Sequence, residues 1–131
     1  MEFDTSSPIW LQLVTEFSRR IVTGEWGQGQ RIPGVRELAL RLGVNPNTVQ
    51  RALGEMERDG LCRSERTSGR FVTDDSQRIS TLRRALVTEA ADDYIRVSRG
   101  LRMEVSDAVA LIDERWNHHD MADLDRARTE A

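Results

Sequence analysis

The sequence has only one cysteine, Cys62, and lacks any apolar run long enough to cross a membrane. A single thiol cannot form an internal disulfide, and it cannot supply a multi-thiolate metal site. A membrane span needs about 20 consecutive apolar residues, and the N-terminus also lacks the basic-then-apolar pattern of a signal peptide. These absences predict a cytoplasmic protein with no membrane partner, in which Cys62 is a small buried residue.

Lysine is also absent, so that all 19 basic side chains are arginines. Each carries a planar guanidinium that suits a phosphate or a guanine edge, although genomic base composition can produce the same bias. The chain has 131 residues, of which 38% are hydrophobic and 31% charged. This length and composition predict one ordinary domain, or a small domain with an appendage, and exclude a large catalytic domain.

The charge is unevenly distributed along the chain. The net charge is −3, which argues against nucleic-acid binding because phosphate contacts supply most of the affinity for DNA. Residues 31–70, however, contain eight arginines and five acidic residues, whereas the rest of the chain is acidic. The local basic excess therefore indicates the segment in which a DNA-binding surface is expected.

The first half of the chain has the pattern of three helices. Apolar residues recur at three- and four-residue steps over residues 7–24, and glycines then predict an irregular connection. Residues 35–42 and 49–56 share one apolar spacing, and Gly43 and Asn45 between them suit a helix end and a helix cap. Two short helices joined by a tight turn predict a helix-turn-helix.

A β-hairpin and two further helices are expected after it. Residues 61–64 and 70–73 flank a loop that contains glycine, which predicts a hairpin, the wing of a winged helix. Apolar residues then continue at helical spacing over 79–95 and 105–116. Residues 118–131 are polar and predict either a short extra helical turn or a frayed tail.

The predicted fold is mostly α with a small β-hairpin. It comprises an N-terminal winged helix-turn-helix, the DNA-binding domain over residues 1–75, and a C-terminal antiparallel helical hairpin over residues 76–131. Two helices cannot bury their apolar stripes alone, so a homodimer is the economical arrangement. The residues expected in the dimer interface are Leu82, Leu86, Ile95, Val105, Val109, Ile112 and Trp116.

The recognition helix is expected over Asn45–Asp59. The second helix of a helix-turn-helix enters the major groove, where its first turn reaches base edges. Asn47 can hydrogen-bond an adenine and Thr48 can contact a thymine methyl or a phosphate, although both residues also suit capping and turn chemistry alone. Arg51 is expected toward the groove wall or a guanine and Arg36 at a phosphate, with solvated surface ion pairs as the alternative.

The wing loop, residues 65–70, carries two arginines around a flexible tip, a composition that suits the adjacent minor groove or its phosphates. An ordinary hairpin turn is the alternative interpretation. The predicted DNA-binding residues are Arg36, Asn45, Asn47, Thr48, Gln50, Arg51, Arg66, Ser68, Gly69 and Arg70.

The sequence resembles a known family over residues 1–73. The stretches PIWLQ at 8–12, RIPGVRELA at 31–39, GVNPNTVQRA at 43–52, DGL at 59–61 and SGRFV at 68–72 resemble the GntR family of winged-helix regulators. The short two-helix C-terminus resembles the YtrA-type subfamily.

This resemblance implies a repressor that binds a palindromic operator as a homodimer. It places DNA contacts at Arg36, Asn47, Thr48, Arg51 and Gly69. The sequence departs from the family at Gly34, where a capping serine is usual. Gly54, inside the recognition helix, is expected to cost about 1 kcal/mol relative to alanine.

No catalytic constellation or cofactor motif is visible, and we do not expect an enzyme. His118 and His119 are neighbours, and neighbouring residues on a helix do not face one another, so solvated histidines are favoured over a metal site.

The sequence leaves open whether a small-molecule effector regulates the protein. Its pocket is expected between the C-terminal helices and the winged domain, near Trp116, Tyr94 or Met103, unless these side chains simply fill the dimer interface. The rival function is a winged-helix adaptor that binds a protein and no DNA. The polar residues expected on the outer face of the recognition helix argue against that alternative.

Overall fold

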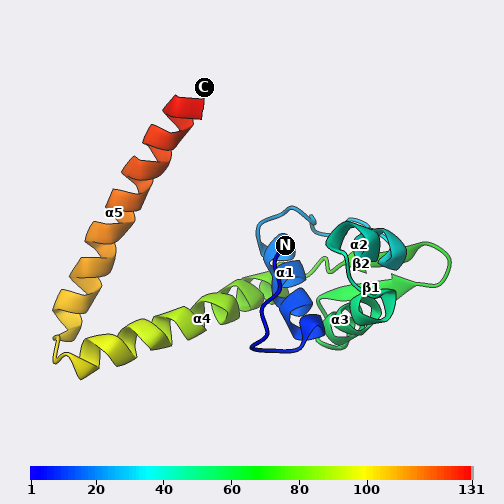
Figure 1. Ribbon diagram of the computed structural model, residues 1–131, viewed down its shortest axis with the longest axis horizontal. Coiled ribbons are helices and arrows are strands. Elements are labelled where there is room, and N and C mark those ends of the chain that lie inside the picture. The colour runs from blue at the N-terminus through cyan, green and yellow to red at the C-terminus, as the bar shows by residue number, and fades with distance from the viewer. Residues whose placement is uncertain (131) are drawn as a thin grey trace. The chain divides into compact units, whose positions relative to one another are not determined.

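The computed structural model describes residues 1–130, except for the side chains of residues 124, 125 and 128–130. Five helices and one two-stranded antiparallel sheet make up this part of the chain, which confirms the predicted mostly α fold with a small hairpin (Figure 1). The chain forms two compact units, one ending at Val87 and one beginning at Thr88. No helix over residues 1–130 has both the length and the apolar character that a bilayer span requires.

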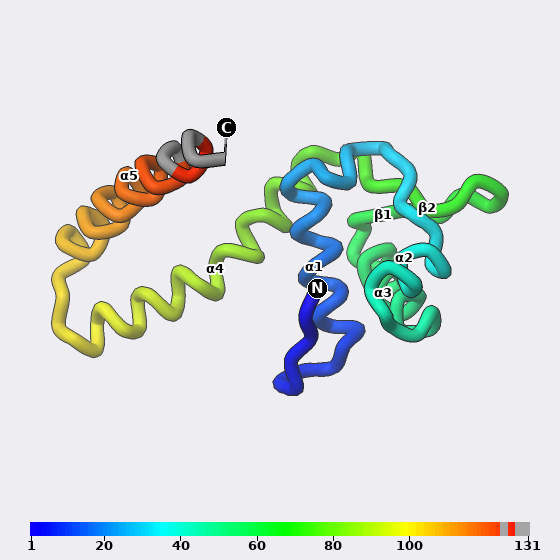
Figure 2. The backbone as a smooth tube through the Cα atoms, turned by 45° about the horizontal axis from the view of Figure 1, so that its top comes forward, coloured from blue at the N-terminus to red at the C-terminus, as the bar shows by residue number. Residues whose placement is uncertain are grey.

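The first unit is built around three helices, α1 (Ile9–Val22), α2 (Val35–Leu42) and α3 (Pro46–Arg58). α2 ends at Gly43, whose φ of 68° is the left-handed conformation that glycine adopts without steric cost. α3 begins two residues later, after Val44, at the cap Asn45. The predicted helix-turn-helix is therefore present, and α1 and α2 both pack against α3 (Figure 2).

The core of this unit lies where the apolar faces of these helices meet. Phe17 of α1 and Val49 and Met56 of α3 have no solvent-exposed area. Trp26, which follows α1, packs its ring 5.0 Å from that of Phe17. Removal of so much apolar surface from water fixes how the three helices pack, and hence which face of α3 remains in solvent.

The wing is formed by β1 (Cys62–Glu65) and β2 (Gly69–Val72), which pair antiparallel with Cys62 opposite Val72. A third segment, residues 29–32, lies along the other side of β2. Ile32 donates its N–H to the carbonyl of Arg70 at 2.8 Å, and Val72 donates to the carbonyl of Gln30 at 2.9 Å. The connection that the glycines predicted to be irregular therefore carries ladder hydrogen bonds to the wing.

The last two helices are α4 (Ser76–Gly100) and α5 (Val105–Glu130). The first unit extends beyond the domain boundary predicted at residue 75, because Ile79 and Leu82 of α4 pack against its core. The chain reverses over residues 101–104, where Arg102 adopts a φ of 62°. α5 continues as one helix to Glu130, whereas the polar sequence after His118 predicted only a short turn or a frayed tail.

Candidate nucleic-acid interface

The start of α3 is fixed by Asn45, whose side-chain oxygen accepts the backbone N–H of Asn47 at 2.8 Å. Pro46 occupies the first helical position, where its missing N–H costs no hydrogen bond. The Asn45 oxygen is thus used for capping. The side chain of Asn47 is exposed and forms no hydrogen bond with the described residues, while Thr48 is half-buried. Asn47 is therefore free to meet a ligand at the positive end of the helix.

One turn later, Arg51 is exposed on the side of α3 that faces α1. Its guanidinium carbon lies 4.2 Å from the centroid of the Trp10 ring. Gln50, also exposed, accepts a hydrogen bond of 3.4 Å from an Nη of Arg70. Arg51 and Gln50 are therefore each held by a residue from outside α3.

The side chain of Arg70 contacts α3. Its side chain is only 16% exposed, and its Nε is 3.6 Å from a carboxylate oxygen of Glu57. This Nε has no hydrogen-bond partner among the described residues. The Arg70 side chain thus connects the wing to the recognition helix. Its role in DNA contact remains a prediction.

The tip of the wing carries Arg66, Ser68 and Gly69, all exposed. Arg31, which was absent from the predicted DNA-binding residues, donates its Nε to the carbonyl of Ser68 at 2.8 Å. Gly69 has a φ of 103°, and a Cβ added there would lie 2.9 Å from the same Nε. Arg31 therefore anchors the wing loop, and the only sequence signal for it was its place in the stretch 31–39.

The eight arginines between residues 31 and 70 fall into two groups. One group forms ion pairs with carboxylates in the structure and consists of Arg41, Arg58, Arg63 and Arg70. The other group, which we call the unpaired arginines, has no carboxylate partner among the described residues and consists of Arg31, Arg36, Arg51 and Arg66. The unpaired arginines lie at the wing, at the first turn of α2 and on α3. With the side chains that the structure describes, Arg36 and Arg51 thus form none of the surface ion pairs considered for them.

Cys62 is buried in the first unit, as predicted, with its Sγ 3.8 Å from the carbonyl of Leu53. Burial is the main reason that the pKa of this thiol rises to about 11, and the nearby carboxylate of Glu57 adds to the effect. A thiol of such high pKa carries almost no thiolate at neutral pH and is a poor nucleophile or metal ligand. In the part of the chain that the structure describes, no three His, Cys, Asp or Glu side chains are placed to hold a metal ion.

The apolar residues predicted for dimerisation divide between the two units. Leu82 packs on the core of the first unit, and Leu86 is half-buried. The members in the second unit are exposed, with Val109 at 61% and Trp116 at 68%. The remaining exposed members are Ile95, Val105 and Ile112.

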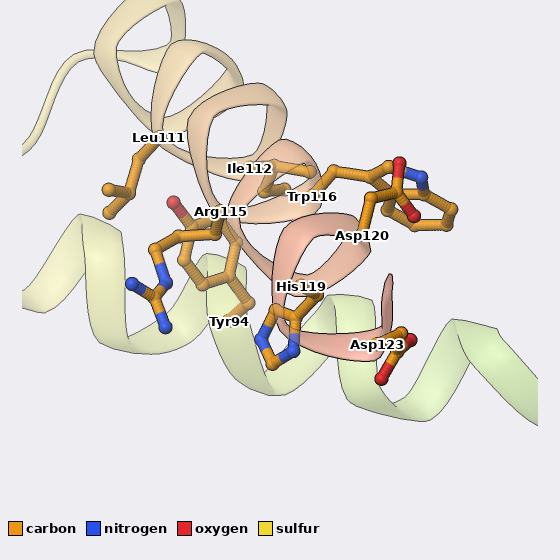
Figure 3. Close-up of a pocket in the computed structure, with 8 residues that line it drawn as sticks. All are labelled: Tyr94, Leu111, Ile112, Arg115, Trp116, His119, Asp120 and Asp123. Atoms are coloured by element: carbon orange, nitrogen blue, oxygen red, sulfur yellow. The ribbon is translucent and has the colours of Figure 1, made fainter. Parts of the chain in front are cut away.

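Two crevices in the second unit contain the aromatic residues singled out for an effector. The first, of about 410 Å³, is lined by Tyr94 of α4 and by a row of α5 side chains that includes Leu111, Arg115 and Trp116 (Figure 3). The second, of about 430 Å³, is lined by Tyr94 and Met103 among others. The Tyr94 hydroxyl donates a hydrogen bond of 2.8 Å to the Ala108 carbonyl. Both crevices lie within the helical unit itself.

Comparison with known proteins identifies the first unit. Residues 11–72 match the family described as bacterial regulatory proteins, gntR family. The HTH-type transcriptional regulator YhcF of Bacillus subtilis is 34% identical over 100 residues, which cover 76% of this chain and 83% of that protein. The HTH-type transcriptional repressor YtrA of the same organism is 33% identical over 73 residues, 56% of each chain.

Solved structures agree with these relatives. A GntR family transcriptional regulator from Listeria monocytogenes has 33% identity and a TM-score of 0.78, covering 86% of this chain and 98% of that one. The DNA-binding domain of AraR, solved in complex with an operator, has 30% identity and a TM-score of 0.51, covering 56% of this chain and 93% of that one. With its winged helix-turn-helix and these relatives, the chain belongs to the GntR family of bacterial regulatory proteins and is a DNA-binding transcription regulator.

Proposed function

We propose that this protein is a cytoplasmic repressor that binds a palindromic operator as a homodimer. α3 enters the major groove and the wing reaches the adjacent minor groove. The observation that carries the proposal is that Arg36, Arg51 and Arg66 have no carboxylate partner among the described residues, because a cation without such a partner is available to a phosphate or a base edge. The operator complexes solved for the AraR domain support the same use of this fold.

The proposed DNA contacts are of two kinds: contacts to phosphates, which position the protein, and contacts to base edges, which recognise the sequence. Arg36, in the first turn of α2, is placed to bind a phosphate and fix the register of the protein on the duplex. Asn47, exposed at the start of α3, is placed to bond the edge of an adenine, and Thr48 to meet a thymine methyl or a phosphate. Arg66 and Gly69 bring the wing tip to the minor groove or its phosphates.

The homodimer rests on the exposed apolar side chains of the second unit. Val105, Val109 and Trp116 are each more than half exposed. Covering these apolar side chains with a second copy would remove them from water and stabilise the dimer. Two copies related by a twofold axis would present two recognition helices, which matches a palindromic site.

The direct test is a mobility-shift titration of the protein with its own promoter region at two salt concentrations. Arg36→Ala and Arg51→Ala should weaken binding, whereas Arg41→Ala should have little effect because Arg41 already pairs with Glu37. Removal of the phosphate contact at Arg36 should reduce the slope of log K against log salt by about 1. Wild-type binding to the promoter that is no stronger than binding to random duplex would contradict the proposal, and no binding to either duplex would favour the adaptor.

A small-molecule effector would be sought at the crevices beside Tyr94. A compound that binds there should raise the melting temperature of the protein and change its affinity for the operator.

A further inference from the structure

We infer that Trp10 is a positioning residue for DNA binding, whose indole ring holds the guanidinium of Arg51 ready to meet the duplex. This inference rests on the proposed function and adds to it a residue on α1, outside the helix-turn-helix and the wing. Trp10 lies in the first turn of α1 and is half-buried. α1 packs against α3 (Figures 1 and 2). A side chain from α1 therefore reaches the recognition helix.

The contact between the two residues has the geometry of a cation–π interaction. The guanidinium carbon of Arg51 lies 4.2 Å from the ring centroid of Trp10, well within the roughly 6 Å over which such contacts are attractive. Arg51 donates no hydrogen bond to any described residue. The ring therefore holds the cation, and the N–H donors of the guanidinium remain available.

The acidic residue best placed on α3 to pair with Arg51 has another partner. Glu55 stands four residues after Arg51 on α3, a spacing at which a glutamate and an arginine commonly pair. Glu55 instead pairs with Arg58, 2.8 Å from its Nη. Arg51 is thus held by a neutral ring, and its full charge remains available to a phosphate.

An arginine held in this way also loses less freedom when DNA binds. A free arginine side chain has many rotamers, and ordering one of them at an interface opposes binding. Because Trp10 restricts Arg51 before the encounter, the contact with DNA should form at a smaller entropic cost. Loss of the ring should weaken binding even though Trp10 need not touch DNA.

The test is a double-mutant cycle measured by fluorescence anisotropy on a labelled promoter fragment at fixed salt. The proteins are the wild type, Trp10→Leu, Arg51→Ala and the double variant. Trp10→Leu should raise Kd by about three- to tenfold, as expected when one more long side chain has to be ordered at the interface. In the Arg51→Ala background the same change should alter Kd by less than about twofold, because the partner is already gone.

Two further variants separate positioning from packing. Trp10→Phe keeps an aromatic ring and should recover most of the affinity lost in Trp10→Leu. Leu11→Ala removes apolar surface from a partly exposed neighbour on the same turn and should leave Kd unchanged. Melting temperatures of all variants show whether the fold has been retained.

The outcomes distinguish this inference from the proposed function. An equal loss of affinity from Trp10→Leu in both backgrounds would mean that the ring acts only through packing of α1, and would overturn the inference. Tighter binding by Trp10→Leu would mean that the ring withholds Arg51 from DNA, which also overturns it. If the wild type shows no preference for the promoter, the proposed function fails and this inference fails with it.

Discussion

Arg31 and Ser68 are joined by a hydrogen bond of 2.8 Å, from the Nε of the arginine to the backbone carbonyl of the serine. The bond connects the segment before the helix-turn-helix to the tip of the wing. The same guanidinium lies over Gly69, where a side chain would collide with it. The conformation of the wing loop is therefore fixed by a residue that precedes it by 37 positions.

Replacement of Arg31 by alanine should loosen the wing loop, because the Ser68 carbonyl loses its donor. We expect faster hydrogen–deuterium exchange at the backbone amides of residues 66–69, with little change in the rest of the first unit. Arg66→Ala is the control, since it removes a charge from the loop and leaves the anchor in place. Unchanged exchange in Arg31→Ala would show that the loop holds its shape without Arg31.

The cap of the recognition helix should contribute measurably to stability. Asn45→Ala removes the oxygen that accepts the Asn47 N–H and should lower the free energy of unfolding by about 1 kcal/mol, as measured by urea denaturation. Asn45→Asp keeps an acceptor at the same place and should lose much less. If both variants lose the same amount, the cap bond is not the cause.

Two glycines in the helix-turn-helix should respond to alanine in opposite directions. Gly54 lies inside α3, and a Cβ built there meets no atom within 4 Å, so Gly54→Ala should stabilise the protein by about 0.5–1 kcal/mol through helix propensity. Gly43→Ala should destabilise it, since this residue has a φ of 68°. Thermal melting of both variants, compared with the wild type, gives the two signs.

Cys62 should react only when the protein unfolds. Its thiol pKa of about 11, against an ordinary 9.0, means that the folded state keeps the proton to higher pH. Alkylation by iodoacetamide at pH 8 should be slow for the native protein and rapid in urea. Rapid alkylation without denaturant would contradict the burial of this residue.

The same thiol has a consequence for stability in alkaline solution. Because the folded state has the higher pKa, the contribution of Cys62 is complete below about pH 9 and is lost as the pH rises toward 11. The difference in free energy of unfolding between the wild type and Cys62→Ala should therefore shift in favour of the variant across this interval. A constant difference would argue against the raised pKa.

A charge on the exposed face of α5 should disrupt the proposed homodimer. Val109→Glu places a carboxylate among the exposed apolar residues of the second unit, and burial of that charge against a second copy would be costly. Analytical ultracentrifugation should then show a monomer at concentrations where the wild type is dimeric. Leu40→Glu, on an 83% exposed residue of α2, should leave the oligomeric state unchanged.

Features of this fold that depend on neighbouring residues could be predicted from the sequence. The left-handed end at Gly43 and the cap at Asn45 follow from local stereochemistry, and together they locate the helix-turn-helix. The exposure of Asn47 follows from the apolar spacing of α3, whose buried residues begin at Val49.

Features that depend on distant residues could not be predicted. Three contacts join segments that local patterns treat separately: the ladder between residues 29–32 and β2, the bond from Arg31 to Ser68, and the cation–π contact between Arg51 and Trp10. The helical pattern of α4 likewise does not say which of its apolar residues belong to the winged unit. Leu82, for example, packs against that unit's core, and its predicted place in a dimer interface remains a prediction.

The ladder between residues 29–32 and β2 joins the two ends of the segment that contains the helix-turn-helix. The chain leaves this ladder at Ile32, builds α2, α3 and β1, and returns to it at Arg70, so that the helix-turn-helix lies inside a closed loop of backbone. Such long-range pairing requires the ends of the loop to be brought together before it can form, which opposes early formation of this ladder during folding. A winged helix-turn-helix transferred to another protein must therefore begin before Gly29 and end after Val72. A shorter fragment would contain α3 but would lack the ladder that supports the wing.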